Sequence, residues 1–227
     1  MDRLVLFDID GTLLSGGPAK DAFHRALVEV FGTAGPIGEW EFSGKTDPQI
    51  ARELLGEAGL RDEEIDAGFP RLWSRYLAEM ESRLPERPPR ALPGVPELLM
   101  ELSGRGTVAL ALLTGNVAEG ARLKLAAAGL ASWFAVGAFG SDREKRNELP
   151  TIAVRRARDH WGVEFLARRV VVVGDTPRDV DCGRCHGART VAVATGRFGE
   201  GALRETGADV VLRDLGETAA ALDAILS

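Results

Sequence analysis

Five short apolar runs along the chain are continuous rather than alternating between apolar and polar positions. They cover residues 4–9, 108–114, 170–173, 190–194 and 209–212. Runs of this kind are typical of strands buried on both faces of a parallel sheet, although a short apolar run is also compatible with buried helix. Leucines and alanines at helical spacing fill the intervals at 98–102 and 123–130. The alternation of strand and helix predicts an α/β fold.

The segment from about residue 16 to 85 breaks this alternation. It shows helical spacing at residues 23–31 and 72–80 and no convincing strand. Five prolines between Arg83 and Pro96 then disfavour helix and indicate a stiff connector. We therefore predict a catalytic core of residues 1–15 and 86–227, with a small α-helical, four-helix-like cap inserted as residues 16–85. A length of 227 residues suits a core with a modest insertion.

Composition and charge exclude several classes of protein. The chain is 45% hydrophobic and 27% charged, which is ordinary for a folded protein and unlike disorder. A net charge of -6 argues against broad binding of nucleic acid, which needs a basic face. The acids in the first ten residues are unlike a secretory signal, and no apolar stretch is long enough to span a membrane. These features predict a cytoplasmic protein.

Two cysteines, Cys182 and Cys185, are too few and too close together for a disulfide framework, and we expect them to be reduced. Together with His186 they match the c-type haem attachment pattern. We set that interpretation aside because the chain shows no export signal and the segment falls in the helix expected after Asp179.

Polar residues stand at the ends of three of the predicted strands. Asp8 and Asp10 end the first strand, Thr114 ends the second, and Asp175 follows the third. Because ligands of open α/β sheets bind outside the carboxyl ends of the strands, we expect these residues to share one crevice. An Asp after a strand is also a common helix N-cap, but Asp8 interrupts an apolar strand, where a capping role has no obvious use.

Three carboxylates in one crevice repel one another unless a cation or protons compensate them. Oxygen ligands without a nearby His or thiolate set favour a hard ion, and Mg²⁺ is the usual match for phosphate substrates. The glycines Gly11 and Gly115 can bring amides close to an anion, and the hydroxyls of Thr12 and Thr114 lie beside them. A phosphoryl group fits such a crevice.

Three segments resemble motifs of the haloacid dehalogenase-like (HAD) hydrolases, in particular of the phosphoglycolate-phosphatase-like branch. LVLFDIDGTLL is similar to the first motif, LLTGN to the second and VVVVGDTPRDV to the fourth, in the same order. The resemblance covers the whole chain. It implies a Rossmann-like core and a Mg²⁺-dependent phosphatase that hydrolyses a small phosphomonoester, phosphoglycolate-like or a sugar phosphate, through an aspartyl-phosphate.

The resemblance also implies roles for individual residues. Asp8 would be the nucleophile, and Asp10 would protonate the leaving oxygen and then deprotonate the hydrolytic water. Mg²⁺ would be held by Asp8, the Asp10 backbone carbonyl and Asp175, with Asp179 a direct or water-mediated ligand. The residues expected around the phosphate or substrate are Gly11, Thr12, Thr114, Gly115, Asn116 and Lys45. Dehalogenating members lack an acid at the position of Asp10, so dehalogenation is not expected.

The third motif departs from the family pattern, which places a Lys before the helix that precedes the fourth motif. Here either Lys145 or Arg146 is a candidate for the cation beside Asp8, and alignment on the following helix slightly favours Arg146. In the insertion, residues 43–47 resemble the cap loop that reads the substrate, where Lys45 would bind a second anionic group. Thr46 or Asp47 is also expected to N-cap a helix that starts near Pro48.

Two alternatives stay open at this point. One is a phosphomutase of the β-phosphoglucomutase kind, which passes the phosphoryl group to a second hydroxyl. The other is a non-catalytic regulatory or binding module on the same fold, because fold does not guarantee function. In the leading interpretation the partner is a small phosphorylated metabolite, not nucleic acid or a membrane.

Overall fold

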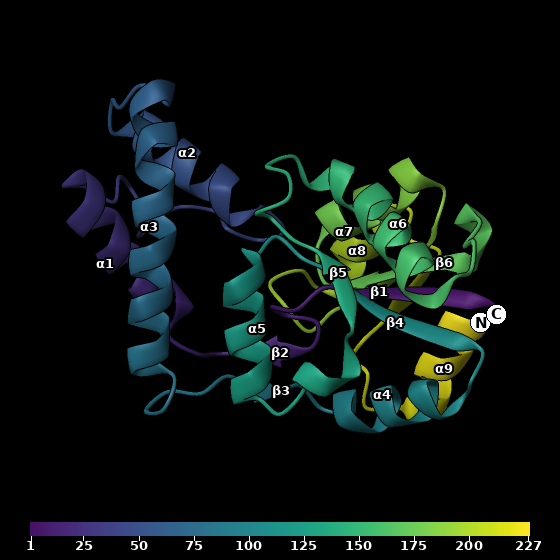
Figure 1. Ribbon diagram of the computed structural model, residues 1–227. Helices are drawn as coiled ribbons and strands as arrows, with labels where there is room; N and C mark the ends of the chain where they lie inside the picture. The colour runs from purple at the N-terminus through teal and green to yellow at the C-terminus, as the bar shows by residue number, and fades with distance from the viewer.

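The computed structural model describes all 227 residues and contains a six-stranded parallel sheet with a helical insert at one side (Figure 1). From one edge to the other, the strands are β5 (Val136–Ala138), β4 (Val108–Leu113), β1 (Arg3–Phe7), β6 (Val170–Gly174), β7 (Arg189–Val193) and β8 (Val210–Leu212). All neighbouring strands pair in parallel. The predicted α/β fold with a Rossmann-like sheet and an inserted helical cap is confirmed.

Helices cover both faces of the sheet, which explains the continuous apolar strands. The first face carries α4 (Val95–Gly104), α5 (Ala118–Ala127) and α9 (Thr218–Leu226), and the second carries α6 (Leu149–Trp161) and α7 (Pro177–His186). Val5 and Phe7 of β1 pack on the first face, whereas Leu4 and Leu6 pack on the second. Every position from Leu4 to Phe7 is therefore buried against a helix.

The remaining core elements are short. They are α8 (Glu200–Glu205) beside β8 and the 3-10 turns η1 (Ala131–Trp133), η2 (Arg146–Glu148) and η3 (Ala167–Arg169). The sequence did not predict β5, which has three residues and no run of branched side chains. No helix is both long enough and apolar enough to cross a membrane.

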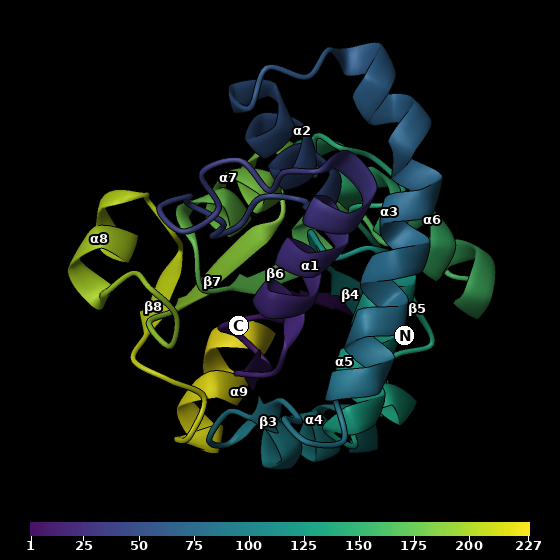
Figure 2. The same cartoon turned by 90° about the vertical axis from the view of Figure 1, so that its left-hand side faces the viewer.

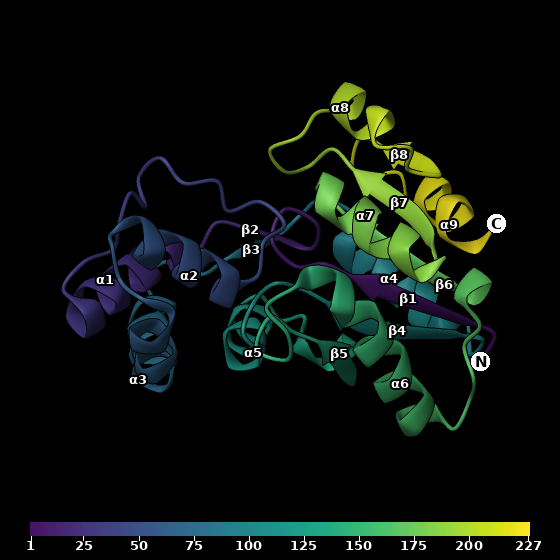
Figure 3. The same ribbon diagram turned by 90° about the horizontal axis from the view of Figure 1, so that it is seen from above.

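The insert contains three helices, so the prediction of a four-helix-like cap was wrong. They are α1 (Ala19–Phe31), α2 (Asp47–Glu57) and α3 (Asp62–Arg83), and Figure 3 shows them beside the sheet rather than on it. Between α1 and α2 the chain is irregular from residue 32 to 46, where Gly32 ends α1 in the left-handed region and Pro36 follows. We call this segment the α1–α2 loop.

The insert has its own apolar cluster of 17 buried residues, which includes Phe23, Leu54 and Leu72. Val117 and Leu123, at and after the start of α5, belong to the same cluster. The insert is therefore anchored on α5. The division of the chain at residues 15/16 and 85/86 stays a prediction.

The two connections between core and insert lie side by side. β2 (Leu14–Ser15) and β3 (Arg90–Ala91) form a short antiparallel pair, so the proline-rich connector contains a strand that the sequence did not predict. Gly16 and Gly17 follow β2 with φ of 78° and 90°, a region that other residues rarely adopt. Glycine therefore allows the chain to turn from the sheet edge into α1.

Candidate active site

A cavity of about 450 Å³, which we call the cleft, lies between the carboxyl edge of the sheet and the insert. Seen from the side of the insert, α1 and α3 lie in front of the strands (Figure 2). Nine of the residues singled out from the sequence line the cleft: Asp8, Asp10, Gly11, Lys45, Thr114, Gly115, Asn116, Arg146 and Asp175. Thr12, Lys145 and Asp179 do not. The structure thus brings together the residues that follow the carboxyl ends of β1, β4 and β6, which we call the first, second and third strand exits.

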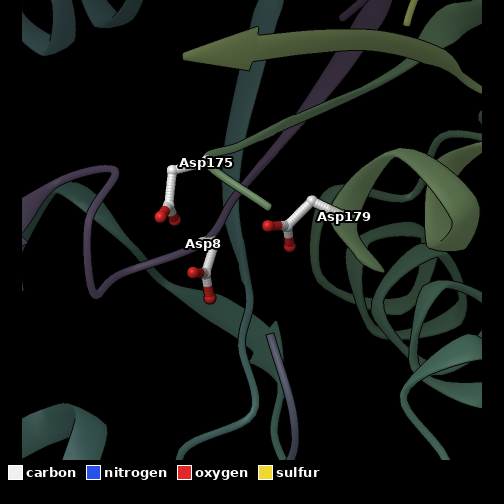
Figure 4. Close-up of side chains that lie close together, drawn as sticks. All are labelled: Asp8, Asp175 and Asp179. Carbon is white, nitrogen blue, oxygen red and sulfur yellow. The ribbon is translucent and has the colours of Figure 1, made fainter. Parts of the chain in front are cut away.

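The carboxylates of Asp8, Asp175 and Asp179 lie close together at the carboxyl edge of the sheet (Figure 4), where Asp8 and Asp175 line the cleft and Asp179 does not. One oxygen of each lies within 4.8 Å of the others, and the residues are only 2–5% exposed. Burial, together with the charges of Asp179 and Asp8, raises the pKa of Asp175 to about 8. Burial raises the pKa of Asp8 to about 6 against the opposing effect of Arg146. Carboxylates that resist ionisation at such close range fit a hard divalent cation, which would compensate their charge.

Arg146, rather than Lys145, lies beside Asp8. Its Nη2 is 3.0 Å from Asp8 Oδ1 and 2.5 Å from Asp179 Oδ1, whereas Lys145 is exposed and does not line the cleft. Burial disfavours the charge of Arg146, but Asp179 and Asp8 outweigh it and raise the pKa of the guanidinium. Nε is buried without a partner. Nη1 makes no hydrogen bond to the protein. One terminal nitrogen of the guanidinium, Nη1, is therefore not used by protein groups.

Asp179 is fully engaged by protein groups. Its second oxygen, Oδ2, accepts from the Thr176 amide at 3.0 Å and from Thr176 Oγ1 at 2.7 Å, which completes a capping box at the start of α7. Thr176 is the N-cap of α7, and Asp179 is the third residue of the helix, whose side chain accepts from the N-cap amide. Asp179 also forms an ion pair with Arg146, and it thereby helps to fix the guanidinium that lies beside Asp8.

Asp10 lies apart from the three buried carboxylates and pairs with Lys124 of α5. Lys124 Nζ donates to the two Asp10 oxygens at 2.9 and 2.7 Å and to Asn116 Oδ1 at 2.6 Å, and Asn116 Nδ2 donates to Asp10 Oδ2 at 2.8 Å. Partial desolvation disfavours the charge of Asp10, although its side chain is 48% exposed, but Lys124 and Asn116 outweigh this effect and lower its pKa. The ionised form of Asp10 is therefore the stable one here.

Sequence reasoning missed Lys124. A lysine in a helix ordinarily points to solvent, yet this one is only 6% exposed. The available signal was its spacing, because Lys124 follows the buried residues Gly120 and Ala121 by four and three positions and so shares their face of α5.

Gly11 and Thr12, which were expected near a phosphate, instead contact the side chain of Asp175. The Gly11 amide donates to Leu14 O at 2.8 Å and is not free for an anion, while a Cβ on Gly11 would lie 2.4 Å from Asp175 Oδ2. Thr12 is fully buried, and its hydroxyl donates to Asp175 Oδ1 at 3.2 Å. Both residues shape the pocket of the carboxylate rather than line the cleft as ligands.

The second strand exit keeps its polar groups near the cleft. The Thr114 hydroxyl accepts from Asn116 Nδ2 at 2.8 Å, and both residues are buried. A Cβ on Gly115 would lie 2.1 Å from Lys45 O. A glycine is therefore needed at this position, where the α1–α2 loop contacts the backbone after β4.

The start of α2 is fixed on the core by hydrogen bonds. As predicted, Thr46 N-caps α2, with Oγ1 accepting from the Gln49 amide at 3.2 Å; it also donates to Glu144 O at 2.6 Å. The Asp47 amide donates to Gly115 O at 2.8 Å, and Asp47 Oδ2 accepts from the Val117 amide at 2.8 Å. These bonds hold the insert closed over the second strand exit.

Lys45 points its ammonium at Glu53 of α2, with which it forms an ion pair inside the insert. Across the cleft, Arg197 from the segment after β7 forms an ion pair with Glu41 of the α1–α2 loop. No local pattern points to Arg197, because the residue that it pairs with, Glu41, lies far away in the chain.

The parallel sheet, the carboxylates at its carboxyl edge and the helical insert above them define an α/β enzyme whose active site lies between core and insert. Residues 3–187 match the family model described as haloacid dehalogenase-like hydrolase. The chain belongs to this family. It is therefore a hydrolase, as the sequence predicted, and the non-catalytic alternative is not supported.

Individual relatives agree with this assignment. The chain is 30% identical to "Phosphoglycolate phosphatase" of Synechococcus elongatus over 86% of this chain and 84% of the relative. It is 29% identical to "Phosphoglycolate phosphatase, plasmid" of Cupriavidus necator over 93% and 89%. In fold it is similar to a hydrolase from Pseudomonas syringae, with a TM-score of 0.75 and 23% identity over 100% of both chains.

Proposed function

We propose that this protein is a Mg²⁺-dependent phosphatase that hydrolyses a small phosphomonoester through an aspartyl-phosphate on Asp8. The observation that carries the proposal is the surroundings of Asp8. A carboxylate at the end of a central strand is buried, lies 3.0 Å from the guanidinium of Arg146 and shares a 4.8 Å cluster with Asp175 and Asp179. No structural role of Asp8 accounts for this concentration of charge.

The metal would be held by Asp8, Asp175 and the backbone carbonyl of Asp10. Asp179 would act through a water molecule, because both of its oxygens already accept hydrogen bonds from Arg146 and Thr176. When bound, Mg²⁺ supplies positive charge that compensates the carboxylates and the transferring phosphoryl group.

In the first step an Asp8 oxygen attacks phosphorus, and the bond from phosphorus to the leaving oxygen breaks while Asp10 gives that oxygen a proton. In the second step Asp10 takes a proton from water, the water oxygen attacks phosphorus, and the Asp8 carboxylate is released. The second step uses the ionised form of Asp10, which Lys124 and Asn116 stabilise. Lys124 therefore favours the hydrolytic half of the reaction.

The phosphoryl oxygens would be bound by Thr114, Asn116, the Gly115 amide and the free Nη1 of Arg146. Arg146 can hold Asp8 and bind the phosphoryl group at the same time, because Nη2 contacts Asp8 and Asp179 while Nη1 contacts neither. Gly11 and Thr12 would act indirectly by holding Asp175.

The names of the relatives make phosphoglycolate the first substrate to try, with sugar phosphates next. Phosphate release from a panel of these esters should require Mg²⁺, stop with EDTA and be lost in Asp8→Asn. Asp2→Asn is a matched control, because Asp2 is exposed just before the opposite end of β1.

Release that persists in Asp8→Asn would refute the aspartyl-phosphate. If the wild-type protein transferred the phosphoryl group to a second hydroxyl of a sugar phosphate faster than to water, the enzyme would be a phosphomutase instead.

A further inference from the structure

The cleft contains one cation with no acidic partner. Five cationic side chains line it, and four are paired: Arg146 with Asp8 and Asp179, Lys124 with Asp10, Lys45 with Glu53, and Arg197 with Glu41. The fifth, Lys20, forms no ion pair or side-chain hydrogen bond. Its ammonium lies 4.9 Å from the centre of the Phe42 ring. A lysine exposed to a cleft and unpaired in it is available to a ligand.

Lys20 stands on the insert side of the cleft, at the second residue of α1. The acid in the same turn, Asp21, is paired with Arg87 and leaves the charge of Lys20 uncompensated.

Aromatic side chains of the insert form the wall next to Lys20. Phe23, Phe42 and Tyr76 line the cleft. Phe23 is held by a stacked contact to Trp73, with ring centres 6.1 Å apart, and by an edge contact to Tyr76 at 5.4 Å. Phe23 is therefore held in place by its neighbours, and the three rings give this part of the wall an apolar surface, in contrast to the carboxylates of the opposite wall.

The size of the cleft indicates what would fill it. A volume of about 450 Å³ falls in the range of pockets that hold whole metabolites or drug-sized molecules, and glycolate is far smaller than that. A leaving group as short as glycolate would therefore occupy only a small part of the cleft.

We propose that the preferred substrate has a leaving group with an apolar, ring-sized body that packs on Phe23 and Phe42 and a terminal carboxylate that binds Lys20. The proposal rests on the phosphatase function argued above. It makes Lys20 the residue that reads the distal anion, in place of Lys45, whose ammonium is already neutralised by Glu53.

The test compares two esters that differ only in the distal anion, phenyl phosphate and 4-carboxyphenyl phosphate. The ratio of their kcat/KM values, carboxylated over plain, is measured in the wild-type protein, in Lys20→Gln and in Arg25→Gln. Arg25 is the matched control, because it is exposed on the same helix, has no ion pair and does not line the cleft. We expect the ratio to fall about tenfold in Lys20→Gln, the size of one charged hydrogen bond, and to stay the same in Arg25→Gln. Lys20→Arg should restore most of it.

A second measurement separates this inference from the catalytic proposal. Binding of the two esters to Asp8→Asn, with and without Lys20→Gln, is measured by calorimetry in the presence of Mg²⁺. Equal effects of Lys20→Gln on both esters, in turnover and in binding, would overturn the role of Lys20. If neither ester is hydrolysed by the wild-type protein but the binding ratio still depends on Lys20, the assignment of the distal site stands and the phosphatase proposal fails for this substrate class.

Discussion

The two walls of the cleft are built by different means. On the core wall, Asp8 and Thr114 follow directly from strands, and the sheet ladder continues through their amides, which donate to Val173 O and Ala138 O at 3.0 Å each. On the insert wall, Lys20 and Phe42 come from a helix end and an irregular loop and are exposed or half-buried. The backbone therefore fixes the positions of Asp8 and Thr114, whereas side-chain contacts fix the positions of the groups that would meet the leaving group.

The largest effect should come from the core wall. Asp8→Asn removes the nucleophile and should reduce kcat by about 10⁴-fold or more, while the fold is kept because Asn is nearly the same shape. Steady-state kinetics and circular dichroism check both parts. A variant that retained a tenth of the activity would contradict the nucleophilic role of Asp8 and weaken the contrast with the insert wall.

Lys124 tests whether the core wall extends to α5. Lys124→Met keeps the length of the side chain but leaves Asp10 without its cation, and we expect kcat to fall about 10- to 100-fold, within the range of a misplaced general acid-base group. Stopped-flow kinetics should show the loss in the dephosphorylation of the aspartyl-phosphate. Arg122→Met, on the exposed face of the same helix, is the control. Equal rates in the two variants would remove Lys124 from the site.

The pH dependence of stability probes the carboxylate cluster without its metal. The pKa of Asp175 is raised to about 8 in the folded protein, from about 4 for a free Asp, so the native state holds the proton more tightly than the unfolded state. Stability from this proton is complete below about pH 4 and is lost as the pH rises through 8.

In EDTA, Asp175→Asn should therefore melt above the wild-type protein at pH 8, by a few degrees or on the order of 2 kcal/mol, and the gap should shrink at pH 5.5. Excess Mg²⁺ should reverse the order at pH 8, because only the wild-type protein retains the ligand. A gap that is the same at the two pH values would show that Asp175 does not titrate in this range.

The smallest effect concerns the contact between the walls. Thr46→Ala removes the N-cap of α2 and the hydrogen bond to Glu144 O, and we expect a loss of about 1 kcal/mol in unfolding free energy with little change in kcat. Urea denaturation measures it, and Thr46→Ser should behave as the wild-type protein. A large loss of kcat in Thr46→Ala would mean that closure of the insert, and not only the core wall, limits the rate.

The sequence predicted the core wall well because strands buried on both faces leave a clear apolar pattern, and a polar residue at the end of such a strand stands out. Asp8, Thr114 and Asp175 were located in this way, and all three line the cleft. The choice between Lys145 and Arg146 required the structure, because the turn η2 sends one neighbour inward and the other outward.

The insert wall could not be predicted, because its groups are placed by contacts between distant segments. Arg197 owes its position to Glu41, and Lys45 is neutralised by Glu53; neither pairing has a local pattern. The fourth helix expected in the insert is replaced by the α1–α2 loop, whose glycines and Pro36 prevent regular structure.

The adjacent strands β2 and β3 also bear on how the chain finds its fold. The central pairing of β1 with β4 joins Arg3 to Val108, so most of the residues between them must be looped out before the sheet can start. Contacts that are so distant in sequence slow folding, because the entropy of closing a long loop is lost before the pairing compensates it. Once α1 and α3 have packed together and Leu14 has paired with Ala91, most of the chain between β1 and β4 is already enclosed in a folded insert. If the insert folds early, it would therefore shorten the loop that must close when β1 pairs with β4, and so speed the formation of the sheet.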